Sequence, residues 1–298
     1  MSVRRIAALL TVPLLLVPVA ACSDDSGGKQ GAVPAVTGDA GKKPKIAAGE
    51  GEAPKDLKVK VLEKGDGKKV AKGEILRADY LGQTWDGNVF DNSYDRGAPA
   101  SFPIGVGSVV KGWDEGLVGQ NVGSRVELVI PPAKGYGSRE QSGIPADSTL
   151  VFVVDIKDSI STKLDGKVVE PEDGDLPKVS TEDNGKPASV EIPKGAKEPK
   201  EIVSETVIEG DGKPVGAKSS VLVNYAAVLW KDGSQVGSTE QSGPQEYPVE
   251  QLKPWGGELV GKKAGSRVLV VVPKDKLSKE QQQVGSTVVF VVDVLAVF

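Results

Sequence analysis

The sequence contains no histidine among its 298 residues. This absence removes the side chain that most often acts as a general base, as the partner of a serine or cysteine nucleophile, and as a metal ligand. A hydrolase or a zinc enzyme is therefore disfavoured, and we expect neither a cofactor nor a metal. Cysteine occurs once, at position 22. No disulfide can form within the chain, so its stability must come from packing and hydrogen bonds.

The chain also lacks a strong charge of either sign. Its formal net charge is −4, and the absence of a basic excess argues against a nucleic-acid partner. Glycine and proline are frequent, with 37 and 20 residues, and 39% of the residues are hydrophobic. This length and composition predict two ordinary domains, each with its own core, separated by loose connectors.

Long apolar runs are confined to the start of the chain, MSVRRIAALLTVPLLLVPVAAC. Arg4 and Arg5 precede an apolar stretch that is short for a membrane span and contains two prolines. This layout predicts a signal peptide over residues 1–21. The last four residues, VAAC, resemble the lipobox of bacterial lipoproteins, which implies lipidation of Cys22. We expect an extracytoplasmic protein anchored to the cell membrane by this lipid, the alternative being a plain signal peptide with an incidental cysteine.

Residues 22–54 have almost no large apolar side chains. Such a composition cannot bury enough apolar surface to fold alone. We therefore predict a flexible tether that holds the following domain away from the membrane.

An internal duplication accounts for most of the remaining chain. KGWDEGLVGQNVGSRVELVIPP (111–132) and KPWGGELVGKKAGSRVLVVVPK (253–274) agree at 11 of 22 positions. STLVFVVD (148–155) recurs as STVVFVVD (286–293). Similar order and spacing predict two related domains, residues 55–160 and 199–298. The polar segment 161–198, rich in proline and glycine, is predicted to be a flexible linker.

Within each copy, alternating apolar residues predict strands with one buried face, as at Leu150, Phe152 and Val154. Val109, Trp113 and Leu117 instead follow helical spacing after Ser108, a candidate N-cap. The expected fold is α+β and mostly β. Each domain is predicted to be an antiparallel sheet wrapped on one short helix.

Four motifs in order suggest a family. They are ADYLGQTWDGNVFDNSYDRGAP (78–99), VVKGWDEGL (109–117), PPAKGYGS (131–138) and GIPADSTLVF (143–152). Together they resemble the strand and bulge, the helix, the flap and the last strand of the FKBP family, the tacrolimus- and rapamycin-binding peptidyl-prolyl cis-trans isomerases. The resemblance covers about residues 55–160 and implies an FKBP-type fold and isomerase activity.

The resemblance also implies a shallow apolar pocket. Trp113 forms its floor, and Asp91 and Arg96 match a polar pair at its edge. In the family, the backbone N–H matching Val110 and the hydroxyl matching Tyr136 bind ligand carbonyls. The walls match Tyr80, Phe90, Val109, Val110, Tyr136, Ile144 and Phe152. The sequence departs at Ala100, where the family often has phenylalanine, so binding of tacrolimus or rapamycin is expected to be weak.

This chemistry needs no histidine. Rotation about an amide faces a barrier of about 18–20 kcal/mol because resonance is lost in the twisted state. The twisted amide has less charge separation than the planar one, so an apolar, preorganised pocket disfavours the ground state more than the transition state. No covalent bond is broken. Taken singly, the aromatic residues could equally be core residues.

The second copy keeps what a fold needs and loses the rest of the site. Tyr225, Trp255 and Phe290 match Tyr80, Trp113 and Phe152. Positions 236 and 237, however, hold valine and glycine where the first copy has Phe90 and Asp91, and the GYG of 135–137 has no counterpart. Pro254, Gly256 and Gly257 predict a short or frayed helix. We expect a degenerate FKBP-like domain without meaningful isomerase activity.

The leading hypothesis is a lipid-anchored prolyl isomerase that acts on proline-containing unfolded or exported polypeptides. One alternative is a holdase-type chaperone that binds such segments and turns them over poorly. Another is an envelope lipoprotein in which both domains are scaffolds for protein contacts. Intact Phe90, Asp91 and Tyr136 favour the enzyme, whereas the degenerate second copy favours a binding role.

Overall fold

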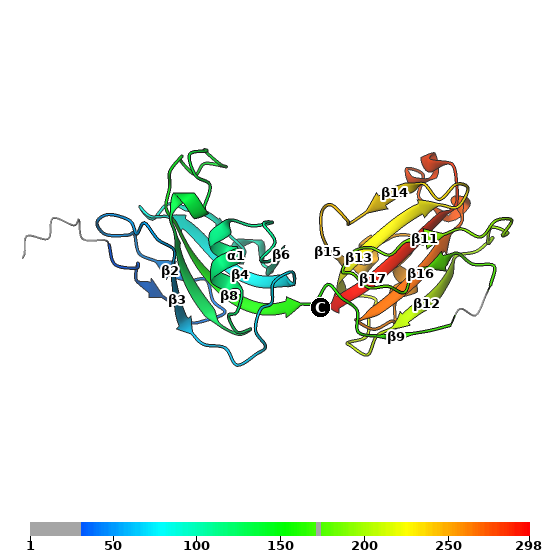
Figure 1. The fold of residues 1–298 in the computed structure, drawn as a ribbon, viewed down its shortest axis with the longest axis horizontal. Coiled ribbons are helices and arrows are strands. Elements are labelled where there is room, and N and C mark those ends of the chain that lie inside the picture. Colours follow the sequence, from blue (N-terminus) through cyan, green and yellow to red (C-terminus); the bar gives the residue numbers. More distant parts are fainter. Residues whose placement is uncertain (1–30, 171–173) are drawn as a thin grey trace, which may run out of the picture.

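The computed structural model describes residues 31–170 and 174–298. The expected signal peptide and Cys22 therefore lie outside the described residues. Within the described ranges the chain is mostly antiparallel β-structure, as the sequence predicts. No helix in these ranges is long and apolar enough to cross a membrane. Figure 1 shows two sheets in separate lobes, with the end of strand β8 close to the C-terminus of the chain.

The first sheet is built from strands within residues 58–160. Its strands are β3 (Lys58–Glu63), β4 (Ile75–Thr84), β5 (Val89–Asn92), β6 (Ala100–Pro103), β7 (Arg125–Ile130) and β8 (Leu150–Ile160). The spatial order is β3-β7-β8-β4-β5, and β6 pairs with the first half of β4. All pairings are antiparallel. The longest strands, β4 and β8, pair at the centre, so their side chains are buried on both faces.

One short helix, α1 (Lys111–Leu117), lies against this sheet (Figure 1). Trp113 and Leu117 are buried and pack with Leu128 in one apolar cluster. Gly112 allows the helix to approach, because a Cβ at this position would lie 2.5 Å from Ile130. The predicted N-cap is wrong. The helix begins one residue after Val110, no side chain caps it, and Ser108 lies before its first turn.

The second sheet repeats the first. The strands that match those of the first sheet are β12 (Val203–Glu209), β13 (Ser220–Leu229), β14 (Gln235–Ser238), β15 (Gln245–Pro248), β16 (Ser266–Val272) and β17 (Val288–Val297). The order β12-β16-β17-β13-β14, with β15 on β13, matches β3-β7-β8-β4-β5 with β6 on β4. We refer to the two sheets with their covering elements as the first and second repeats.

The two repeats differ in what covers the inner face. The first has α1 and two 3₁₀ turns, η1 (Tyr94–Arg96) and η2 (Pro132–Lys134). In the second, the described residues form no α-helix, contrary to the expected one helix per domain. Its turns are η3 (Val249–Gln251), η4 (Gly256–Leu259), η5 (Lys274–Lys276) and η6 (Gln281–Val284). Glycines 256 and 257 lie where the helix would be, and glycine is poor in helix interiors.

The segment predicted to be a free tether is partly folded. Strands β1 (Val36–Thr37) and β2 (Lys45–Ile46) form a hairpin, which we call the leading hairpin (residues 36–46). It packs on the face of the first sheet that is opposite α1. The carbonyls of Gly38 and Lys42 each accept a hydrogen bond of 2.7 Å from the guanidinium of Arg125. The segment that follows the hairpin continues along the sheet to Trp85, whose carbonyl accepts a hydrogen bond from the Gly49 N–H at 2.7 Å.

The segment predicted to be a linker is structured in the same way. Strand β9 (Lys167–Val168) pairs with β12, and β10 (Lys178–Val179) pairs with β11 (Val190–Glu191) in a second hairpin. Arg267 donates to the carbonyls of Ser180 and Glu182 at 2.7 and 3.0 Å. The repeated unit therefore includes a hairpin before each sheet. Polar composition did not reveal it, because backbone carbonyls and a buried arginine hold it in place.

The two repeats touch through corresponding ends of their sheets. Ile75 and Ile160 of the first repeat form one apolar cluster with Leu222 and Leu295 of the second. The guanidinium carbon of Arg77 lies 3.9 Å from the ring centre of Phe298, and its Nε lies 3.5 Å from Glu246. These contacts lie at the starts of β4 and β13, at the ends of β8 and β17, and on β15.

Candidate active site

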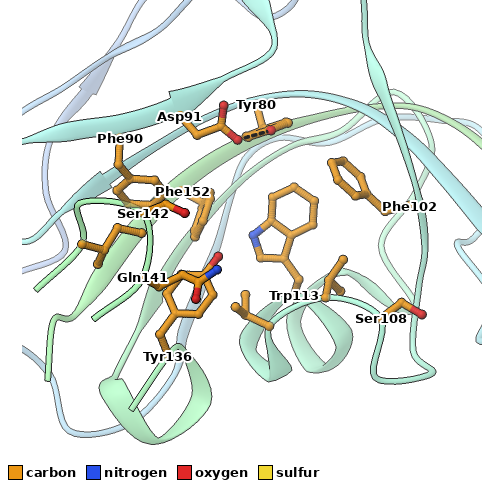
Figure 2. A pocket seen from close by; sticks show the side chains of 13 residues that line it. Tyr80, Phe90, Asp91, Phe102, Ser108, Trp113, Tyr136, Gln141, Ser142 and Phe152 are labelled. Carbon is orange, nitrogen blue, oxygen red and sulfur yellow. Dashed lines mark hydrogen bonds between the residues drawn. The ribbon is translucent and has the colours of Figure 1, made fainter. Parts of the chain in front are cut away.

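A cavity of about 370 Å³ opens between α1 and the inner face of the first sheet. Figure 2 shows aromatic rings arranged around its space, with Trp113 rising from α1. Trp113 has only 3% of its surface exposed. The lining side chains belong to Tyr80, Phe90, Asp91, Phe102, Ser108, Val109, Val110, Trp113, Tyr136, Gln141, Ser142, Ile144 and Phe152. Most of this surface is apolar, which suits a weakly polar ligand such as a prolyl ring.

The rings meet edge to face. The centre of the Trp113 ring lies 5.4 Å from that of Tyr80, 5.2 Å from Phe102 and 5.3 Å from Phe152. Phe90 contacts Phe152 at 5.5 Å. Such T-shaped contacts are favourable for aromatic quadrupoles and fix the rings in place. The cavity is therefore preorganised, because its walls already hold one another before any ligand enters.

The absence of a side chain at Gly82 leaves room for the rings of Phe90 and Phe152 above strand β4. Gly82 lies on β4 at the register shift between β4 and β5 and pairs with Asp91. A Cβ at this position would lie 2.5 Å from the Phe152 ring and 2.8 Å from the Phe90 ring. Only a residue without a side chain leaves room for both. The GQTWDG segment thus places Phe90 over the sheet and Asp91 at the rim.

A polar network lies at the rim of the cavity. The Tyr80 hydroxyl donates to Oδ2 of Asp91, as the dashed line in Figure 2 marks. Arg96 from η1 donates to Oδ1 of Asp91 at 2.6 Å and to the Tyr80 hydroxyl at 2.7 Å. Ser93 holds the connecting loop, because its hydroxyl accepts the Tyr80 N–H at 3.0 Å and donates to Asp79 at 2.8 Å.

The network fixes the charge state of its members. Burial and the hydrogen bond to Asp91 raise the pKa of Tyr80 to about 12, so the phenol stays protonated. Burial acts to raise the pKa of Asp91, but hydrogen bonds from Tyr80 and Arg96 outweigh it and lower that pKa. The hydrogen bond to Asp91 also raises the pKa of Arg96. The rim therefore presents a fixed ion pair and a neutral phenol at neutral pH.

Two donors at the cavity lack partners among the described residues. Nε1 of Trp113 is buried and unpaired, and Figure 2 shows it on the side of the indole that faces Phe152. The Tyr136 hydroxyl, on the loop after η2, has no hydrogen bond to a described residue, and burial raises its pKa. A buried donor without a partner is costly, so it favours a ligand that supplies an acceptor such as a carbonyl.

Comparison with known proteins identifies the first repeat. The family model for FKBP-type peptidyl-prolyl cis-trans isomerases matches residues 66–157. The FK506-binding protein of Streptomyces anulatus is 40% identical over 118 residues, which is 39% of this chain and 95% of that protein. The FK506-binding protein 1A of Neurospora crassa is 42% identical over 102 residues, or 34% of this chain and 85% of the relative.

The chain belongs to the FKBP family. It is a peptidyl-prolyl cis-trans isomerase, as its sequence motifs predict. Among solved structures, FkpA from Escherichia coli matches 35% of this chain and 47% of its own, with 43% identity and a TM-score of 0.33. AtFKBP13 matches 35% of this chain and 92% of its own, with 36% identity and the same TM-score.

The structure brings the residues predicted for the FKBP site together. Nine of the ten line the cavity, and the tenth, Arg96, is bonded to the lining residue Asp91. Sequence reasoning missed Phe102, Ser108, Gln141 and Ser142, which also line it. Phe102 had a detectable signal, because it lies two residues after Ala100 on a strand and therefore on the same face. Gln141 and Ser142 lie in an irregular loop, where no periodic pattern exists.

The second repeat keeps the buried aromatic residues but not the rim. Trp255 lies 5.3 Å from Phe290 and 6.3 Å from Tyr225 between ring centres. Gly237 pairs with Ala227 in the second repeat, as Asp91 pairs with Gly82 in the first. Gly237 therefore occupies the position of Asp91. Val236 is 44% exposed. One hydrogen bond of the loop is the same in both repeats. The Thr239 hydroxyl accepts the Tyr225 N–H at 2.9 Å, as the Ser93 hydroxyl accepts the Tyr80 N–H.

Proposed function

We propose that this FKBP-type enzyme performs its isomerisation in the cavity of the first repeat. The observation that carries the proposal is the buried, unpaired Nε1 of Trp113 inside a cage of aromatic rings, beside the ion pair of Asp91 and Arg96. A prolyl ring that lies on Trp113 would pack against the apolar walls. The carbonyls on either side of this ring would accept hydrogen bonds from Nε1 of Trp113 and from the Tyr136 hydroxyl.

The geometry suits catalysis by shape rather than by proton transfer. A planar X–Pro amide carries charge separation that water stabilises, and the barrier to its rotation is about 18–20 kcal/mol. Moving the amide into this cavity removes the water that stabilises it. The twisted transition state loses less of this stabilisation than the planar ground state does, so the barrier falls. The fixed dipoles of Tyr80, Asp91 and Arg96 lie at the rim, where the flanking peptide must pass. No residue needs to change its protonation state.

We further propose that the substrates are unfolded, exported polypeptides. The signal-like segment 1–21 and the lipobox-like VAAC at its end support an extracytoplasmic protein attached to the membrane through Cys22. Newly exported chains carry X–Pro bonds that interconvert over tens to hundreds of seconds without help. An anchored isomerase outside the membrane would meet such chains before they fold.

The second repeat is proposed to fold without turning over substrate. Its residues at the positions of Phe90 and Asp91 are Val236 and Gly237, so it has neither the second wall nor the rim carboxylate. Trp255 and Phe290 still pack together in its core. It retains the strand order of the first repeat and lacks the groups that would hold a peptide at the rim.

The activity is tested with a protease-free prolyl isomerisation assay on the full chain without residues 1–21. Asp91→Val and Tyr136→Phe should each lower kcat/KM, while Tyr247→Phe in the second repeat provides the matched control. The thermal midpoint should stay unchanged. If both variants retain full activity, the site is elsewhere. If the wild-type chain is inert but suppresses aggregation of an unfolded protein, the holdase alternative is correct.

The anchor has its own test. Expression with Cys22→Ala should release the protein from the membrane fraction, whereas the wild type should stay in it. A protein that remains in the membrane fraction after this change is held there by something other than a lipid on Cys22.

A further inference from the structure

The leading hairpin (residues 36–46) lies against the loop that carries the rim residues of the site. Nζ of Lys43 donates to both carboxylate oxygens of Asp95, at 2.7 and 2.8 Å. Asp95 belongs to η1 and immediately precedes Arg96. The same carboxylate accepts a bond of 2.9 Å from the side chain of Asn92. The hairpin is therefore bound to η1 at the residue before Arg96, which in turn bonds to Asp91.

A buried ion pair provides a second link. Arg125 and Asp155 lie on neighbouring strands, are almost fully buried, and form two hydrogen bonds of 2.6 and 2.7 Å. The Gly41 N–H in the hairpin donates to Oδ2 of Asp155 at 2.8 Å, and the Tyr94 hydroxyl in η1 donates to the same oxygen at 2.8 Å. One carboxylate thus joins the hairpin to the loop of the active site.

The link is continuous from the hairpin to the cavity. Tyr94 and Asp95 are consecutive, and Arg96 follows them in the same 3₁₀ turn. Arg96 in turn bonds to Asp91 and to the Tyr80 hydroxyl, both of which line the cavity. The hydrogen-bond geometry of a 3₁₀ turn is poorer than that of an α-helix, so side-chain contacts add to what holds η1 in place. Its position depends on what its side chains bind on either side.

The second repeat shows which part of this arrangement is general. Its hairpin also supplies carbonyls to a buried pair, Arg267 and Asp293, and Lys186 lies 3.5 Å from Glu240 on the corresponding loop. No counterpart of Arg96 follows, and no tyrosine in the described part of that repeat bonds to Asp293. Among the described residues, the bidentate Lys43 contact and the Tyr94 bond are found in the repeat that has the rim ion pair and not in the other.

We propose that the leading hairpin is a positioning element for the active site, acting through Lys43 and Tyr94 on Arg96. This inference depends on the proposed function of the cavity. Lys43 and Tyr94 do not touch the cavity, so they are not catalytic residues. When the hairpin is seated, η1 holds the guanidinium of Arg96 where it fixes Asp91 and Tyr80. When it is not, the rim loses its fixed geometry while the floor and walls remain.

The experiment compares Lys43→Gln and Tyr94→Phe with Lys45→Gln, which removes an exposed lysine from the same hairpin. Because water screens an exposed ion pair, the effect should be small, and Lys43→Gln should lower kcat by roughly twofold. KM should stay near the wild-type value, because the apolar walls are unchanged. Lys43→Arg should restore kcat, and Lys45→Gln should not alter it.

A second measurement does not need turnover. The NMR resonance of the Arg96 side-chain Nε–H should shift in Lys43→Gln and Tyr94→Phe and stay in place in Lys45→Gln. A shift together with an inactive wild type would contradict the proposed function but support the positioning link. An unshifted resonance, or an unchanged kcat in both variants of an active enzyme, would overturn the inference.

Discussion

Arg96 and Asp91 form an ion pair across the rim of the cavity, with Nη1 to Oδ1 at 2.6 Å. A second nitrogen of the same guanidinium reaches the Tyr80 hydroxyl at 2.7 Å. One planar group thus orients both an anion and a neutral phenol. About half of each side chain of the ion pair is exposed, so its value lies in geometry more than in stability, because water screens exposed pairs.

Arg96→Lys tests this bridging role. Lysine keeps the charge but cannot present a planar fork to two acceptors at once. Loss of one net hydrogen bond, worth about 0.5–1.5 kcal/mol, should lower kcat/KM by between about twofold and tenfold in the protease-free assay. Arg139→Lys, on an exposed loop of the same repeat, is the control. Equal activity of both variants would show that charge alone suffices at the rim.

Glu127 gives a prediction about pH and stability. It has no exposed surface, its carboxylate has no hydrogen-bond partner, and burial raises its pKa to about 7 against the opposing charge of Lys60. The folded state therefore holds a proton that the unfolded state releases above its ordinary pKa. Between the two pKa values, stability falls as pH rises.

Glu127→Gln removes this titration. Relative to the wild type, the variant should gain up to about 3 kcal/mol of unfolding free energy between pH 5 and pH 8. The measurement is urea unfolding of the first repeat at both pH values, with the exposed Glu140→Gln as the control. If wild type and variant show the same pH dependence, Glu127 is not a buried neutral acid.

Arg77 links the two repeats, because its guanidinium stacks on Phe298 and faces Glu246. A cation–π contact contributes about 0.5–2 kcal/mol, depending on burial. Arg77→Ala should let the repeats tumble more independently, which NMR relaxation reports as shorter correlation times for each. Arg139→Ala should leave them unchanged. Correlation times that are the same in Arg77→Ala and the wild type would mean that the apolar cluster alone holds the repeats together.

Much of the site was predictable because it is encoded in local motifs. The pairing of Phe90 and Asp91 with a glycine on β4, and the burial of Trp113, each depend on a few residues in a fixed order. The apolar residues of β8 likewise predict a strand, although the strand is buried on both faces and not on the one face that we expected. These features need no knowledge of distant contacts.

The rest depends on tertiary contacts that leave no periodic signal. The leading hairpin is polar, yet Arg125 binds it through the backbone carbonyls of Gly38 and Lys42. Every residue has a backbone carbonyl, so the sequence does not mark these two. Gly38 has φ +102°, a conformation that favours glycine. A glycine in the sequence can indicate such a turn, but it does not indicate which side chain will donate a hydrogen bond to its carbonyl. The helix start was misplaced for a similar reason. The side chain of Asp114 in the helix accepts the N–H groups of Gly105 and Gly107, a contact that fixes the loop before the helix and that no local pattern around Ser108 indicates.

The central claim is that the first repeat alone carries the working site. Tyr80 and Tyr225 occupy matching positions on β4 and β13, but only Tyr80 bonds to an aspartate and an arginine. The most direct measurement compares Tyr80→Phe with Tyr225→Phe in the full chain, using the same proline-containing peptide. Hydrogen bonds to charged groups contribute about 1.5–3 kcal/mol, so Tyr80→Phe should lower kcat/KM about tenfold or more. Tyr225→Phe should leave it unchanged, and a loss in Tyr225→Phe with full activity in Tyr80→Phe would contradict the account.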